Sequence, residues 1–183
     1  MQSPFASPRA LLGSLAIAAV AAVGATALVS GTSSAGPKGG AQVRMLDECD
    51  PVSFAAAGVA CVGHGDVTIQ EVGASVAATG GHPEWKFKDS KVSLTAGTSL
   101  LIQNRGGETH SFTEVSAFGT GIVPQLNNPA FQGADPAVPV DPTTVGASFV
   151  DPGKSTTIVG LAPGTHMFQC LIHPWMRAVV TVS

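Results

Sequence analysis

The stretch CLIHPWMRAVVTV, residues 170–182, spaces a cysteine, a histidine and a methionine at intervals of three and then continues as a run rich in valine. Such a run is typical of a β-strand, so Arg177 is expected to begin one. Cys170 closes the preceding strand, and the segment between them is a tight turn. Cys170, His173 and Met176 carry lone pairs, and in one short turn they can converge on a single point. The turn therefore predicts a metal site.

A fourth donor must come from elsewhere in the chain. His110 is the best placed candidate, because it begins a strand directly after a glycine-rich turn. His166 lies four residues before Cys170, at the other end of that strand. His64 and His82 fall in a region with helical signals and are expected to be ordinary surface histidines.

The predicted donor set is softer than the sets that hold structural zinc, which rely on several thiolates. Two imidazoles, one thiolate and a weak thioether are the ligands of a mononuclear blue copper site. The sequence thus predicts one copper ion that cycles between Cu(I) and Cu(II). The alternative is that Cys170 and Met176 are buried apolar side chains and His173 is an ordinary loop histidine. That alternative explains each residue separately but not their common spacing.

The first 35 residues carry one positive charge, then an apolar run to about Val29, then small residues. This pattern is typical of an export signal, and the run is also close to the length of an uncleaved membrane anchor. Either reading places the rest of the chain outside the cytoplasm, in a periplasmic, secreted or cell-surface setting. Cys49 and Cys61 are then expected to form a disulfide, which leaves Cys170 as an odd thiol.

Before His82 we expect a flexible linker over residues 36–43 and a small helical prelude over residues 44–81. Asp50 followed by proline is a helix start, and Thr68 with Glu71 matches a capping box. The prelude is too small to fold alone and is expected to pack on the following domain.

From residue 82 the apolar period changes to two, which predicts an all-β, antiparallel sandwich of about a hundred residues. A long connection rich in proline and glycine, residues 116–147, interrupts it. The net charge of −3 gives no reason to expect nucleic acid as a partner. The expected strands are EWKFK, KVSLT, TSLLIQN, HSFTEV, STTIV, THMFQC and RAVVTVS.

The segments CLIHPWMRAVVTV and GGETHSFTEV resemble the two ligand-bearing segments of the cupredoxins, with the loop closest to the amicyanin type. The resemblance covers residues 82–183 and implies a Greek-key sandwich. By position it implies four copper ligands: His110, Cys170, His173 and Met176. The chain departs from the family at Ser111, where many cupredoxins have an asparagine that ties the ligand loops together.

A site with four ligands has no vacancy for a substrate, and the chain has no His-x-His pair of the multicopper oxidases. The expected function is therefore an electron carrier and not an enzyme. The alternatives are a protein that delivers copper and a module whose copper is structural. A redox partner protein is expected to dock on the apolar residues around His173: Leu171, Ile172, Pro174 and Trp175.

Overall fold

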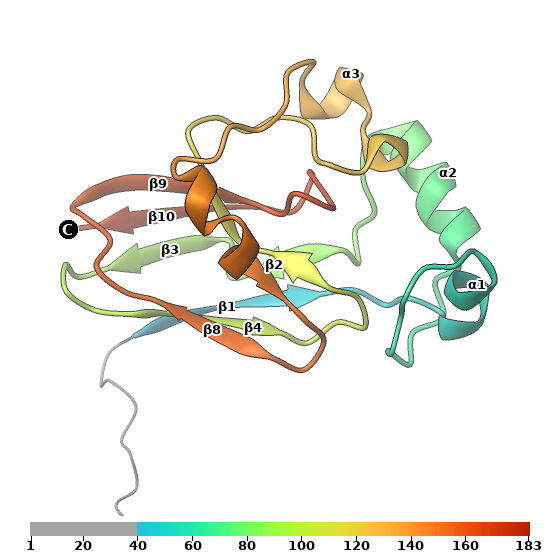
Figure 1. The fold of residues 1–183 in the computed structure, drawn as a ribbon, viewed down its shortest axis with the longest axis horizontal. Coiled ribbons are helices and arrows are strands. Elements are labelled where there is room, and N and C mark those ends of the chain that lie inside the picture. The colour runs from blue at the N-terminus through green and yellow to red at the C-terminus, as the bar shows by residue number, and fades with distance from the viewer. Residues whose placement is uncertain (1–39) are drawn as a thin grey trace, which may run out of the picture. The chain divides into compact units, whose positions relative to one another are not determined.

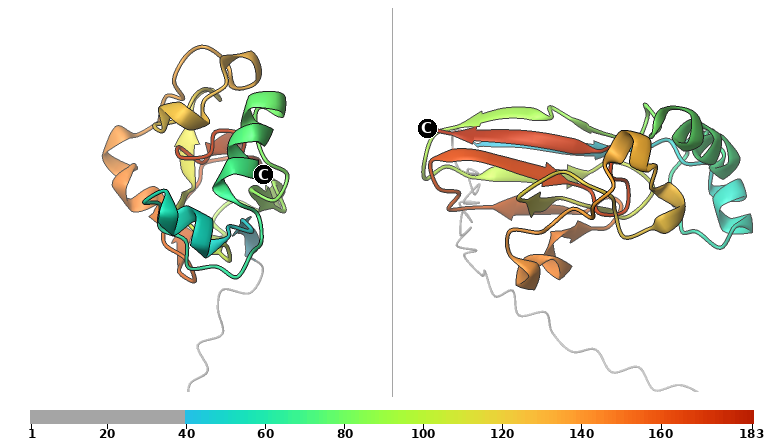
Figure 2. Two further views of the ribbon diagram at one scale, coloured as in Figure 1. Left: turned by 90° about the vertical axis from the view of Figure 1, so that its right-hand side faces the viewer. Right: turned by 90° about the horizontal axis from the view of Figure 1, so that it is seen from above.

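Two four-stranded sheets pack face to face in the computed structural model, which describes residues 40–183 (Figures 1 and 2). The predicted export signal lies outside the described residues. The first sheet has the order β2 (Lys86–Lys88), β1 (Ala41–Leu46), β4 (Leu100–Asn104), β8 (Ser155–Ile158). The second has the order β3 (Lys91–Leu94), β10 (Arg177–Val182), β9 (Gly164–Gln169), β6 (Thr113–Val115). A short pair joins β5 (His110–Ser111) to β7 (Phe149–Val150).

The chain crosses repeatedly between the two sheets, and the architecture is the predicted cupredoxin-like Greek-key sandwich. The predicted strands between residues 84 and 183 are present. The prediction of a purely antiparallel sandwich is wrong for two pairs, since β1 lies parallel to β4 and β3 lies parallel to β10. Each pair joins strands far apart in the sequence, which local periodicity cannot reveal.

The core lies between the sheets, and the alternation of apolar residues along each strand builds it. Val43 and Met45 of β1 are fully buried, as are Leu100 and Ile102 of β4. Burying an aliphatic side chain of this size stabilises the fold by about 1.5–3 kcal/mol.

Strand β1 is the main difference from the predicted boundaries, because it spans the end of the predicted linker and the start of the predicted helical prelude. Its six residues pair with β4 over Ala41 to Met45 and with β2 over Arg44 to Leu46. A run this short fits a strand or a helix turn equally well by its pattern. The sandwich therefore begins before the helices and not at His82.

Helices α1 (Pro51–Ala56) and α2 (Ile69–Thr79) lie at one end of the sandwich (Figures 1 and 2). Both predicted starts are confirmed: Asp50 accepts hydrogen bonds from two amides of α1, and the capping box of α2 is complete. The predicted disulfide between Cys49 and Cys61 is also present. None of the helices among residues 40–183 is both long and apolar enough to cross a membrane.

The connection over residues 116–147 packs against the rest of the unit and contains four short helices: η1 (Pro124–Leu126), α3 (Pro129–Gln132), η2 (Pro142–Thr144) and η3 (Gly146–Ser148). The Asn128 side-chain amide donates to the carbonyl of Val76 in α2 at 3.1 Å. The Ile122 amide donates to the carbonyl of Leu171 at 2.7 Å. The connection thus covers both α2 and the loop between β9 and β10.

Candidate metal centre

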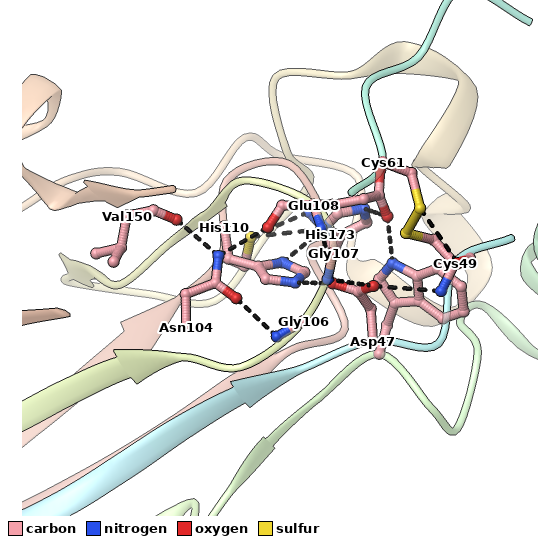
Figure 3. A network of polar contacts seen from close by, with 12 residues as sticks. Asp47, Cys49, Cys61, Asn104, Gly106, Gly107, Glu108, His110, Val150 and His173 are labelled. Carbon is pink, nitrogen blue, oxygen red and sulfur yellow. Dashed lines mark hydrogen bonds and ion pairs between the residues drawn. A yellow bond between two sulfur atoms is a disulfide. The ribbon is translucent and has the colours of Figure 1, made fainter. Parts of the chain in front are cut away.

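Three side chains from two distant segments meet at the helical end of the sandwich. The metal-binding atoms of His110, Cys170 and His173 all lie within 4.8 Å of one another. His110 begins β5, whereas the other two belong to the loop between β9 and β10. The three residues are therefore close together, and Figure 3 shows His110 beside His173, whereas their role as metal ligands stays a prediction.

Both imidazoles present the same nitrogen to the centre of the cluster. Nδ1 of His110 lies 3.1 Å from Nδ1 of His173, which in turn lies 3.8 Å from Sγ of Cys170. His110 and Cys170 have no exposed surface, and His173 is 2 % exposed. Three donors held this close in a buried space can coordinate one ion.

The loop after β9 is closed by its own hydrogen bonds. The Met176 amide donates to the carbonyl of His173 at 2.9 Å, and the Cys170 amide donates to the carbonyl of Met176 at 3.0 Å. The His173 amide also points at Sγ of Cys170, 3.4 Å away. Met176 is buried at the end of this turn, and its role as the fourth ligand remains a prediction.

Ser111 links the two ligand-bearing segments. Its hydroxyl oxygen accepts a hydrogen bond from the Leu171 amide at 2.8 Å, and its own amide donates to Sγ of Cys170 at 3.3 Å. The Thr113 hydroxyl donates to the same hydroxyl at 3.0 Å. The serine thus ties the loops together in the place where many cupredoxins use asparagine.

Asp47 is a functional residue that the sequence did not reveal. It directly follows β1, and its Oδ2 lies 2.8 Å from Nε2 of His110 (Figure 3). The same carboxylate accepts hydrogen bonds from the amides of Gly107 and Glu108 at 2.9 and 3.1 Å. Burial raises the pKa of Asp47, but the hydrogen bonds from His110 and Gly107 outweigh it and leave the pKa below its ordinary value.

The turn that carries Asp47's partners needs its glycines. A Cβ atom at Gly106 would lie within 1.9 Å of the Asp47 carboxylate, and one at Gly107 within 2.6 Å of Sγ of Cys49. The Asn104 side chain fixes the turn by donating to the carbonyls of Glu108 and Val150 at 2.7 and 2.8 Å.

Glu108 is the second residue that sequence reasoning missed. Its Oε2 accepts a hydrogen bond from the Trp85 indole at 2.6 Å and lies 3.6 Å from Nε2 of His173. Burial raises the pKa of Glu108 above its ordinary value. Each candidate imidazole therefore has a carboxylate beside its outer nitrogen, an arrangement that fixes ring orientation in metal sites.

The electrostatics of the cluster suit a metal ion that takes a thiolate. Burial raises the pKa of the Cys170 thiol, but the two neighbouring histidines lower it well below its ordinary value. Burial lowers the pKa of His110, whereas the hydrogen bonds to Asp47 and Cys170 raise it to about 9. A thiolate and two imidazoles in a buried site are donors that a mononuclear copper ion takes, so the residues present fit copper.

The other histidines lie outside the cluster. Both His64 and His82 were predicted to be surface histidines; His64 is exposed and His82 is half-buried. Nδ1 of His166 contacts the Glu114 carboxylate at 2.6 Å, and its Nε2 contacts the carbonyl of Ala162 at 2.8 Å.

The predicted docking residues are less accessible than expected. Leu171 is only 4 % exposed and Pro174 is buried, because the connection over residues 116–147 lies over the loop. Ile172 and Trp175 are half-buried. His173 is buried as well, and it lines a pocket.

No protein-family model matches the sequence, and no curated protein matches it. Among solved structures, a purple cupredoxin from Nitrosopumilus maritimus is 15 % identical over 78 % of this chain and 99 % of its own, with a TM-score of 0.40. Reduced amicyanin is 17 % identical over 54 % of this chain and 73 % of its own, with a TM-score of 0.34. The strand order and the buried cluster are the stronger observations: this chain folds as a cupredoxin-like sandwich whose His–Cys–His cluster resembles a type 1 copper site.

Proposed function

We propose that this protein is an exported one-electron carrier that holds a single copper ion with His110, Cys170, His173 and Met176. The observation that carries the proposal is the buried cluster of two Nδ1 atoms and one thiol. Thiolate and thioether favour Cu(I), imidazole accepts both oxidation states, and copper bound there would supply one-electron exchange.

The surrounding residues support exchange of electrons over catalysis. Ser111 links the two ligand-bearing segments and Asp47 orients His110, which would keep the rearrangement between oxidation states small. His110 and Cys170 have no exposed surface, so of the three clustered residues His173 alone borders the adjoining pocket. A copper-delivery protein would need the site to open, and the packing over the loop between β9 and β10 opposes that.

The direct test is the visible spectrum of the protein loaded with Cu(II) and then reduced. The expected result is one copper per chain and an intense colour, from charge transfer by the Cys170 thiolate, that disappears on reduction. Cys170→Ser should abolish the colour, as should His110→Gln. His166→Gln removes an imidazole outside the cluster and should leave the colour intact. Stoichiometric copper without colour would rule out the blue-copper assignment.

A second experiment separates the carrier from the delivery protein. A carrier in its reduced form should retain copper near neutral pH through repeated oxidation and reduction in the presence of a Cu(I) chelator. Loss of copper to the chelator at each reduction would favour delivery.

The proposal also includes export directed by the first 35 residues, with an uncleaved membrane anchor as the alternative. It further includes docking of a redox partner near Ile172 and Trp175.

A further inference from the structure

An apolar pocket of about 560 Å³ lies between α1, α2 and η1 and reaches the metal cluster. Its walls are formed by apolar side chains, and His173 and Glu108 form part of its lining. A concave apolar space of this size, with a few polar groups at one place, is typical of sites for small organic molecules. The apolar residues of the walls include Phe54, Ile69, Val72, Leu126 and Ile172.

Glu108 supplies a hydrogen-bonding group inside this apolar pocket. The residue is 8 % exposed, and its Oε2 is used by the Trp85 indole. Among the hydrogen bonds within residues 40–183, none goes to the other oxygen, Oε1. Oε1 is not among the buried side-chain atoms that lack a partner within residues 40–183, so it keeps exposed surface where Glu108 lines the pocket. The pocket therefore contains an acceptor that a ligand can use.

Gly73 contributes no side chain to its part of the pocket wall. It lies in the interior of α2 and lines the pocket, and a Cβ atom built on it meets no atom within 4 Å. A glycine within a helix costs about 1 kcal/mol relative to alanine. Packing does not require a glycine at this position, and a larger side chain here would extend into open space beside the pocket.

We propose that this pocket binds a small, neutral aromatic molecule that carries a hydroxyl group, of the phenol class. The ring would pack against the apolar walls, Phe54 among them, and the hydroxyl would bond to Glu108. A hydroxyl can donate to a carboxylate and accept from a carboxylic acid, so it suits either form of Glu108. An ammonium group is disfavoured, because transferring its charge from water into a mostly apolar pocket costs more than transferring a hydroxyl.

The bound molecule would lie against His173 and so beside the proposed copper site. Any part it plays in electron exchange rests on the proposed function, whereas binding itself does not. Binding is therefore tested on the metal-free protein, so that a failure of copper loading and a failure of this proposal remain distinguishable.

The metal-free protein is titrated with p-cresol, toluene and benzylamine, and binding is followed by NMR of the methyl groups of Ile69, Val72 and Ile172. We expect p-cresol to shift these methyls and to bind roughly tenfold more tightly than toluene, because only p-cresol can hydrogen-bond to Glu108. The ¹³C resonance of the Glu108 carboxyl should move with p-cresol and not with toluene. Tightest binding of benzylamine, or no binding of any of the three, would overturn the proposal.

Two substitutions that fill the pocket complete the test. Gly73→Leu should abolish binding of p-cresol, while the matched control Gly73→Ala, which adds one methyl, should bind within about twofold of the original protein. Gln125→Trp fills the same space from η1 and replaces Gly73→Leu if that variant does not fold. Unchanged binding in the variants that fill the pocket would place p-cresol elsewhere and refute the site.

Discussion

Oδ2 of Asp47 lies 2.8 Å from Nε2 of His110, and neither side chain has any exposed surface. Asp47 follows β1, whereas His110 begins β5, so the contact joins two segments 63 residues apart. A histidine that gives Nδ1 to a metal keeps a proton on Nε2, and a carboxylate is its strongest acceptor. The parallel pairing of β1 with β4 is what brings the carboxylate to this place.

Asp47→Asn should therefore weaken copper binding by roughly 10- to 100-fold, the usual effect of changing a group that holds a ligand in place. Removing the negative charge also destabilises Cu(II) relative to Cu(I), so the reduction potential should rise. Competition with a chelator and redox titration measure the two effects. The matched control is Asp89→Asn, which removes an exposed carboxylate paired with Arg44. Equal behaviour of the two variants would contradict a role for Asp47.

Ser111→Ala should leave the Leu171 amide without an acceptor in a buried place. Such a loss costs about 1–3 kcal/mol, which should appear as a lower free energy of unfolding in urea. The control is Ser116→Ala, because Ser116 is exposed and its hydroxyl donates a long hydrogen bond, 3.3 Å, to the carbonyl of Val138. A copper spectrum that shifts in Ser111→Ala and not in Ser116→Ala would show that the link also sets the site's geometry; identical stability of both variants would refute the link.

Replacing Cys49 and Cys61 together with serine removes the disulfide that closes a loop with a sequence separation of 12. Under the chain-entropy model the free energy of unfolding should fall by about 3 kcal/mol. The loop packs on the turn before His110, since the Val62 amide donates to the carbonyl of Gly107 at 2.9 Å. Denaturation of the oxidised protein and of the double variant measures the change; a loss of less than about 1 kcal/mol would mean that the bridge constrains the unfolded chain little.

The parts of this structure that sequence reasoning reached are local. Cys170, His173 and Met176 lie within seven residues, and the caps at Asp50 and Thr68 are read from their immediate neighbours. Asp47 and Glu108 were missed because their roles depend on where β1 pairs, a non-local contact that leaves no local pattern.

The burial of the loop between β9 and β10, which carries His173, was not predicted for a similar reason. The loop sequence is that of an exposed apolar rim, yet the helices and the connection over residues 116–147 cover it. The surface that such a segment covers depends on contacts between residues far apart in the sequence. The periodicity of the segment itself therefore does not predict it.

The ion pair between His166 and Glu114 gives a prediction far from the metal centre. The hydrogen bonds that His166 donates to the Glu114 carboxylate and to the carbonyl of Ala162 raise its pKa above the ordinary value of 6.5. A histidine with a raised pKa in the folded state stabilises the protein fully below its unfolded pKa, and the contribution is lost as the pH rises through the folded value. The window in which the pair stabilises the fold fully therefore lies below about pH 6.5, the ordinary pKa of histidine. His166→Gln should therefore lower the free energy of unfolding most within that window, and the difference from the original protein should shrink toward pH 9. His64→Gln, which changes an exposed histidine, is the matched control. Unfolding in urea at a series of pH values measures both, and parallel curves for His166→Gln and the original protein would show that the pair does not couple folding to protonation.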